Sequence, residues 1–146
     1  MLFDKRYNNG ITHFYRRSLT MSDRAKLSLA IPVIPALDVV KAINFYEEKL
    51  GFAKDFDWGN PVDYGGVIRD GIEIHLFRCE DTELAKNMMF RIMVKNIEAL
   101  YAEYQGTNVI HTNGALEIKP WGYKEFGVAD LDGVCITFCE EDDQSE

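Results

Sequence analysis

Glu73 and His75 are two polar residues that could together bind a ligand. They stand two positions apart in a segment where apolar and polar residues alternate, so both side chains face the same side of one strand. A carboxylate and an imidazole on one face could hold a ligand or a metal ion. Two ligands do not complete a catalytic site, however, and a strand with one solvent-facing side explains the same alternation. We expect a solvent-facing pair.

Four aromatic side chains near predicted turns form a second group of candidates. Phe56, Trp58 and Tyr64 surround the turn at 59–61, and Trp121 stands in a turn between a proline and a glycine. Burial in the core is the common position of such side chains. A large indole in a turn is harder to bury and more often covers a groove. We therefore expect Trp121 to line a binding groove.

The cysteines and the other histidines offer no clear catalytic arrangement. Cys79, Cys135 and Cys139 are an odd number, and the last two would lie about 13 Å apart along one strand, too far for a disulfide. We expect reduced, partly buried thiols, as in a cytoplasmic protein. His13 and His111 have no evident Ser or Cys partner for nucleophilic catalysis.

The charge distribution argues against nucleic acid as a partner. The 146-residue chain has a net charge of −8, whereas phosphate binding needs clustered Lys and Arg. Residues 1–22 carry four basic residues and one acidic residue, a local charge of +3, which leaves −11 for the rest. Such a domain attracts cations, although an acidic surface also serves solubility alone. The chain lacks a stretch of about 18 apolar residues, so we expect no membrane span.

From residue 27 the chain repeats one order of elements twice. The expected strands lie at 27–35, 54–58, 64–69, 72–77, 88–94, 109–111, 115–119, 125–128 and 134–139. Asp38 and Asn96 are expected to cap two helices, which end at Gly51 and Gly106 respectively. Two prolines make the first strand an edge or crossover strand. The fold class is therefore α+β, with two tandem βαβββ modules forming curved mixed sheets.

The domain organisation follows from this repeat. Residues 1–22 are basic and polar without a repeating apolar period, and they lack the apolar stretch of an export signal. We expect an N-terminal extension at 1–22 and a single domain at 23–146. The modules cover about 27–79 and 87–140, and an acidic, solvated tail covers 140–146.

Tandem βαβββ modules resemble the vicinal-oxygen-chelate superfamily, which includes glyoxalases, extradiol dioxygenases and antibiotic-resistance proteins. The resemblance implies that an enzyme of this type would hold a divalent metal ion with His and Glu from strands of both modules. Counted from the helix caps and the last turn, those ligand positions fall on Ile31, Met89 and Thr137. None of the three is a ligand for a hard metal ion. We expect no cofactor, no metal and no catalytic residue.

Within that superfamily, residues 26–141 resemble the bleomycin-resistance proteins. The most specific stretch is Pro-Trp-Gly-Tyr-Lys-Glu-Phe at 120–126. Further matching stretches lie at 30–33, 38–46, 50–56, 67–70, 97–104 and 130–133. The resemblance implies a non-catalytic homodimer that exchanges first strands about a hinge at Pro32 and holds drug in clefts between the subunits.

The resemblance also implies which side chains hold the ligand. Phe56, Tyr64 and, from the other subunit, Trp121 would hold a planar bithiazole. Tyr64 stands where the family has phenylalanine, which adds a hydroxyl that needs a partner. The turn that follows Trp58 is longer than in close family members, which can move Trp58 and Tyr64.

The function expected from the sequence is antibiotic resistance by sequestration of a bleomycin-like drug. Such drugs combine flat rings with a cationic tail, which suit aromatic side chains on an acidic domain. The expected binding residues are Phe56, Trp58, Tyr64 and Trp121, in a cytoplasmic homodimer without nucleic-acid or membrane partners. Two alternatives remain. One is a metal-dependent lyase or dioxygenase of the glyoxalase superfamily that uses Glu73 or His75, and the other is a binder or sensor of another flat cationic molecule.

Overall fold

The computed structural model describes residues 23–144 of the chain. A compact unit begins at Ile31 and contains every helix and strand of the described residues. Residues 23–30 form neither a helix nor a strand, and the side chains of Leu27 and Leu29 are exposed. The extension expected at 1–22 lies outside the described residues.

The first module forms a four-stranded mixed sheet. Its elements are β1 (Val33–Ala36), α2 (Val39–Leu50), β2 (Ala53–Gly59), β3 (Val62–Arg69) and β4 (Ile72–Arg78). The strand order is β1-β4-β3-β2, in which β1 runs parallel to β4 and the other pairs are antiparallel. The expected edge position of the first strand is confirmed.

The first strand is shorter than the expected 27–35, and that prediction is wrong over most of its length. Strand pairing begins at Val33, although the carbonyl of Pro32 still accepts a hydrogen bond from the His75 N–H at 3.0 Å. Because a strand needs a hydrogen-bonding neighbour, the alternating apolar residues at 27–31 do not form one by themselves.

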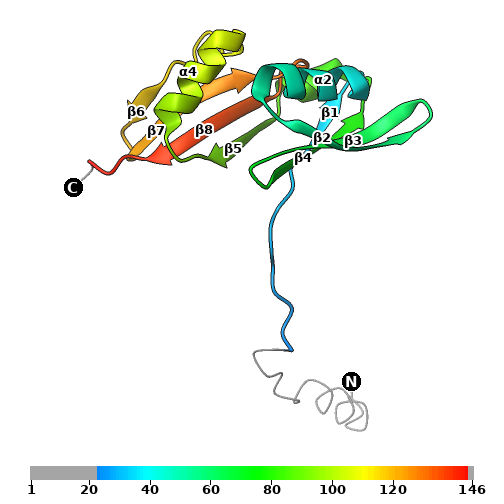
Figure 1. The fold of residues 1–146 in the computed structure, drawn as a ribbon, viewed down its shortest axis with the longest axis horizontal. Helices are drawn as coiled ribbons and strands as arrows, with labels where there is room; N and C mark the ends of the chain where they lie inside the picture. Colours follow the sequence, from blue (N-terminus) through cyan, green and yellow to red (C-terminus); the bar gives the residue numbers. More distant parts are fainter. Residues whose placement is uncertain (1–22, 145–146) are drawn as a thin grey trace, which may run out of the picture. The chain divides into compact units, whose positions relative to one another are not determined.

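The second module repeats this arrangement. A short helix, α3 (Thr82–Lys86), which the sequence did not reveal, leads from the first module into it. The elements of the second module are β5 (Met89–Met93), α4 (Ile97–Thr107), β6 (Glu117–Lys119), β7 (Tyr123–Ala129) and β8 (Cys135–Glu141). The strand order is β5-β8-β7-β6, and β5 runs parallel to β8 just as β1 runs parallel to β4 (Figure 1). The α+β class and the duplication are therefore confirmed.

The helix boundaries test the expected caps. Asp38 accepts a hydrogen bond from the Lys41 N–H at 3.0 Å, and Gly51 adopts a left-handed conformation with φ 71°. Both are confirmed. Gly106, by contrast, lies inside α4, which ends at Asn108 with φ 58°. The expected end at Gly106 is wrong because an asparagine can also adopt the left-handed conformation that terminates a helix.

The start of α4 differs from the expected cap at Asn96. Asn96 occupies the N-cap position, but its side chain makes no capping hydrogen bond. The carboxylate of Glu140 accepts hydrogen bonds from the N–H groups of Asn96 and Ile97 at 2.8 and 2.9 Å. β8 includes Glu140 and Glu141. The expected solvated tail is therefore wrong at Glu140, whereas Glu141 is exposed as expected.

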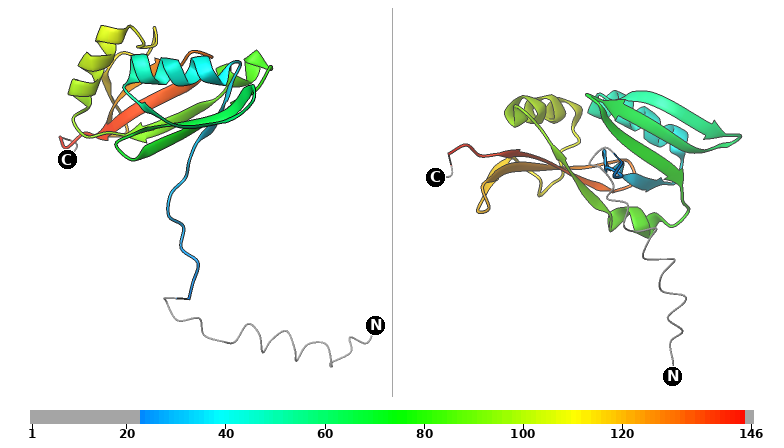
Figure 2. Two further views of the ribbon diagram at one scale, coloured as in Figure 1. Left: turned by 45° about the vertical axis from the view of Figure 1, so that its right-hand side comes forward. Right: turned by 90° about the horizontal axis from the view of Figure 1, so that it is seen from below.

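Each helix covers one face of its own sheet, α2 over the first and α4 over the second (Figure 1; Figure 2 shows further views). Buried apolar residues of both modules form one continuous core beneath the helices. Among residues 23–144, no helix is long and apolar enough to cross a membrane.

Candidate functional site

The face of the first sheet away from α2 carries most of the candidate residues. Gly65 faces α2, since a Cβ there would lie 2.8 Å from the Ile43 side chain. Its neighbour Tyr64 therefore points to the other face. The strand register places Trp58 opposite Tyr64, and both Phe56 and His75 opposite Gly66, on that same face.

Phe56, Tyr64 and His75 form an aromatic cluster on this face. The Phe56 and Tyr64 rings stack with centroids 6.0 Å apart and an interplanar angle of 30°. The His75 ring meets both edge-on, at 5.1 and 5.5 Å. Gly66 makes room for the cluster because a Cβ there would lie 2.4 Å from the Phe56 ring.

Glu73 extends the aromatic cluster by a chain of hydrogen bonds. Tyr64 Oη lies 2.8 Å from His75 Nδ1, and His75 Nε2 lies 2.9 Å from Glu73 Oε1. The His75 and Glu73 side chains are 17% and 29% exposed, whereas Ile74 and Leu76 are buried, so the expected alternation is confirmed and both polar side chains are partly covered. Within residues 23–144, no group of three His, Cys, Asp or Glu side chains could hold a metal ion.

The two tryptophans lie at different places. Trp58 is 69% exposed on β2. Trp121 occupies the turn between β6 and β7 and is 60% exposed. The expectation that this turn keeps the indole out of the core is confirmed. Of the four aromatic candidates, only Phe56 and Tyr64 make a ring contact with each other within the described chain.

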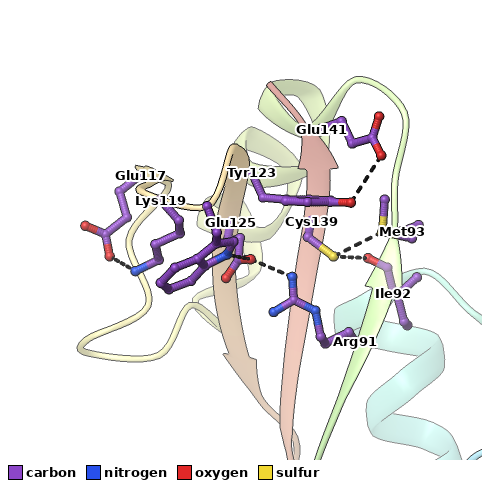
Figure 3. A network of polar contacts seen from close by, with 10 residues as sticks. Arg91, Ile92, Met93, Glu117, Lys119, Tyr123, Glu125, Cys139 and Glu141 are labelled. Carbon is purple, nitrogen blue, oxygen red and sulfur yellow. Dashed lines mark hydrogen bonds and ion pairs between the residues drawn. The ribbon is translucent and has the colours of Figure 1, made fainter. Parts of the chain in front are cut away.

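Trp121 is fixed by a polar network of the second sheet through its bond to Glu125, which Figure 3 shows beside Arg91 and Lys119. Its Nε1–H donates to Glu125 Oε1 at 2.8 Å, and Arg91 Nη2 donates to the same oxygen at 2.5 Å. Glu125 is only 5% exposed. Burial alone would raise the pKa of Glu125, but the hydrogen bonds from Arg91 and Trp121 outweigh it and hold the pKa below its usual value. The buried carboxylate thus remains ionised and holds the indole in place.

Cationic groups lie over two rings of this network. Lys119 Nζ is 6.0 Å from the centroid of a Trp121 ring, and the Arg91 guanidinium carbon is 6.0 Å from that of Tyr123. The sequence reasoning did not single out Arg91 or Glu125. The sequence does contain a signal for Glu125. It is the one acidic residue of β7, and Phe126 and Val128 on the same strand are buried.

A hollow of about 160 Å³ lies beside this network. Its wall includes Glu117, Lys119, Glu125, Cys135 and Thr137. Thr137 is one of the three positions at which the resemblance implies a metal ligand in an enzyme, and it lies opposite Arg91 on β5. Met89, the second such position, is 70% exposed, and Ile31, the third, precedes β1. These positions supply hydroxyl, thioether and alkyl groups, which do not fit a hard divalent metal ion.

The thiols are free, as expected, in Cys79, Cys135 and Cys139. Cys139 is fully buried, and burial raises the pKa of its thiol. A buried thiol with a raised pKa is a poor nucleophile.

A larger cavity of about 520 Å³ lies between the modules and contains none of the candidate residues. Phe52, Ile92, Leu100 and Phe138 are among its apolar lining residues. Arg69 at its edge is paired with Glu103 at 2.9 Å. Arg69 also lies 3.7 Å from Asp70, whereas Lys95, another lining residue, has no ion pair among the described residues.

Comparison with known proteins places this chain in a family. A family model described as "Glyoxalase superfamily protein" matches residues 19–145. The bleomycin resistance proteins of Geobacillus stearothermophilus and Staphylococcus aureus are 26% identical over 129 residues, which cover 77% of this chain and 96% of theirs. A bleomycin-binding protein from bleomycin-producing Streptomyces verticillus, solved with copper(II)-bleomycin, is 33% identical with a TM-score of 0.69, covering 79% of this chain and 97% of its own.

Enzymes also share the fold. A glyoxalase-related enzyme from Clostridium phytofermentans is 24% identical with a TM-score of 0.66, covering 80% of this chain and 97% of its own. The two βαβββ modules define the class as a glyoxalase-type fold. The chain belongs to the glyoxalase superfamily and, within it, to the bleomycin-resistance family.

Proposed function

We propose that this protein binds a bleomycin-type glycopeptide and sequesters it without chemical change. The observation that carries the proposal is Trp121, a largely exposed indole held by a 2.8 Å hydrogen bond to a buried carboxylate. A flat ring binds well to an aromatic face that is already fixed in place, because little freedom is lost on binding. The Phe56–Tyr64 pair offers a second such face.

Charge and similarity support the same ligand. A domain with a charge of −11 beyond residue 22 attracts the cationic tail of such a drug at long range. The similar protein from Streptomyces verticillus was solved with copper(II)-bleomycin. Sequestration requires no metal, and the three positions for metal ligands hold Ile31, Met89 and Thr137.

The proposal includes a cytoplasmic homodimer. Phe56 and Trp121 lie on different sheets and make no ring contact within the described chain, so we propose that Trp121 of a second subunit completes each cleft. Exchange of residues 23–31 about Pro32 would join the subunits, and it would bury the exposed Leu27 and Leu29.

Calorimetric titration with metal-free and copper(II)-loaded bleomycin tests the function. We expect saturable binding with equal numbers of drug molecules and chains, and recovery of the drug with its mass unchanged. Absence of binding to both forms would contradict the proposal. Chemical modification of the drug, together with stoichiometric Ni, Zn, Mn or Fe in the dialysed protein, would instead support the alternative of a metal-dependent enzyme.

A further inference from the structure

The chain of hydrogen bonds from Glu73 through His75 to Tyr64 is not explained by ring stacking. It joins a carboxylate, an imidazole and a phenol on one face of the first sheet, with separations of 2.9 and 2.8 Å. Tyr64 is itself a member of the aromatic cluster, stacked on Phe56 at 6.0 Å. The hydroxyl at the end of the chain therefore lies at the edge of the ring pair to which a flat ligand would bind.

The two hydrogen bonds fix the direction in which each group donates. A carboxylate only accepts, so the hydrogen atom between Glu73 and His75 is on Nε2. The Nδ1 atom of a neutral imidazole is then an acceptor, and the Tyr64 hydroxyl donates to it. This hydroxyl has no other hydrogen-bond partner among residues 23–144. The Tyr64 oxygen can therefore accept a hydrogen bond from a ligand, but its own hydrogen atom is already used in the bond to His75.

The surroundings of His75 add no competing charge. On β1 the residue opposite His75 is Val33, and on β3 it is Gly66. The neighbouring rings belong to Phe56 on β2 and Tyr64 on β3. Glu73, on the same strand as His75, is the one charged side chain that contacts the imidazole among the described residues. It therefore determines which ring nitrogen carries the hydrogen atom.

We propose that Glu73, acting through His75, makes the Tyr64 oxygen a fixed hydrogen-bond acceptor, so that this face selects flat aromatic ligands with an adjacent N–H donor. The inference rests on the proposed function in that it concerns the same ligand site. It assigns Glu73 and His75 as positioning residues and Tyr64 as the residue that contacts the ligand. A phenylalanine in place of Tyr64 would stack in the same way but would not discriminate between donors and acceptors.

The first test needs no ligand. Nitrogen-15 NMR of the full chain at pH 8.5, above the range in which histidines ordinarily change charge, reports which nitrogen of His75 carries hydrogen. We expect hydrogen on Nε2 in the wild type and in Glu73→Gln, which keeps an acceptor oxygen, and a shift toward Nδ1 in Glu73→Leu. Hydrogen on Nδ1 in the wild type would overturn the proposal.

The second test uses two matched probes, the primary amide of 2-phenylthiazole-4-carboxylic acid and its N,N-dimethyl amide. The rings are the same, but only the first probe has N–H donors. We expect the primary amide to bind about tenfold more tightly to the wild type, as one added hydrogen bond allows, and this preference to be lost in both Tyr64→Phe and Glu73→Leu. Combining the two substitutions should cause no further change, because they act on the same oxygen.

Controls separate this selectivity from general damage and from the proposed function. Tyr101→Phe removes a hydroxyl from α4 and should keep the preference, and Glu73→Gln should restore it. Equal binding of both probes to the wild type, or a preference that survives Tyr64→Phe, would overturn the inference even if bleomycin binds. A preference for the primary amide in a protein that does not bind bleomycin would support the inference and contradict the proposed drug.

Discussion

At the scale of single residues, the buried carboxylate of Glu125 fixes two partly exposed side chains of the second module. Its carboxylate is buried, yet one oxygen receives both the Arg91 guanidinium and the Trp121 indole N–H. A buried charge is tolerated only when it is paired and hydrogen-bonded, and one of these partners, Trp121, is the ring that we propose to bind the ligand. The orientation of Trp121 therefore depends on a residue that a ligand need not touch.

Replacement of Trp121 separates a binding role from a structural one. Because the ring is 60% exposed, we expect Trp121→Ala to cost only about 1–2 kcal/mol of stability, chiefly from the lost hydrogen bond. Bleomycin affinity should fall about 5- to 150-fold, as for the loss of one stacked ring. Trp121→Phe should recover part of the affinity because a smaller stacking face remains. Urea unfolding and calorimetry on the same samples measure both quantities.

Leu131→Ala is the control for this experiment. Leu131 is similarly exposed but is not one of the four aromatic candidates, so its removal should leave the bleomycin affinity unchanged. A loss of stability near 4 kcal/mol in Trp121→Ala, the range expected for a core aromatic, with unchanged affinity in the folded fraction, would contradict the assignment of Trp121 to the cleft.

At the scale of secondary structure, α4 shows how a residue distant in sequence can replace a local cap. Asn96 has the left-handed φ of 61° and cannot direct its side chain to the first turn as an extended N-cap residue does. Glu140, on β8, supplies the carboxylate instead and also places negative charge at the positive end of the helix. This contact attaches the helix to the edge of its own sheet.

Glu140→Ala should destabilise the protein by about 1–2 kcal/mol, the usual cost of a lost N-cap. Glu140→Gln should cost less because an amide oxygen still accepts a hydrogen bond. Glu141→Ala is the control, since that carboxylate bonds only the exposed Tyr123 hydroxyl at 3.1 Å among the described contacts. Unfolding in urea at pH 7 measures all three. Equal stabilities of Glu140→Ala and Glu141→Ala would show that the cap contributes nothing.

Local patterns were sufficient to predict most of the fold, and the exceptions have long-range causes. The cap at Asp38 and the end of α2 at Gly51 each depend on residues close in sequence, and the structure has both. The cap of α4 depends on Glu140, 44 residues from Asn96. From the sequence alone, Glu140 could belong to a solvated tail or cap a helix. Only the pairing of β8 decides between the two.

The same difference between local patterns and long-range contacts applies to the candidate site. The turn chemistry around Trp121 predicted an exposed ring, which the structure has. The hydrogen bond between Tyr64 and His75 joins residues 11 positions apart on paired strands, and the ion pair of Arg91 with Glu125 spans 34 positions. Such contacts follow from the strand register, which the sequence alone did not specify at single-residue precision.

At the scale of the whole molecule, buried polar contacts join the two modules. The Tyr46 hydroxyl donates to Asp130 at 3.0 Å, and the Tyr104 hydroxyl donates to the Leu50 carbonyl at 2.8 Å. Burial raises the pKa of Tyr104 to about 12, and burial together with the Asp130 carboxylate raises the pKa of Tyr46 well above its usual value. Both phenols therefore remain protonated and able to donate near neutral pH, so the two sheets are held at a fixed relative position in the compact unit.

Leu27 and Leu29 provide a test of the proposed dimer at this same scale. Both are exposed, in a segment without helix or strand, so replacing them with serine should leave the stability of an isolated subunit unchanged. If the segment instead pairs with a second subunit, the double substitution removes about 6–12 kcal/mol of apolar burial across the two copies of each leucine. We expect the wild type to sediment as a dimer at micromolar concentration and the double variant to shift toward monomer. Leu131→Ser, at another exposed leucine of the described chain, should remain dimeric, whereas a wild type that sediments as a folded monomer would contradict strand exchange.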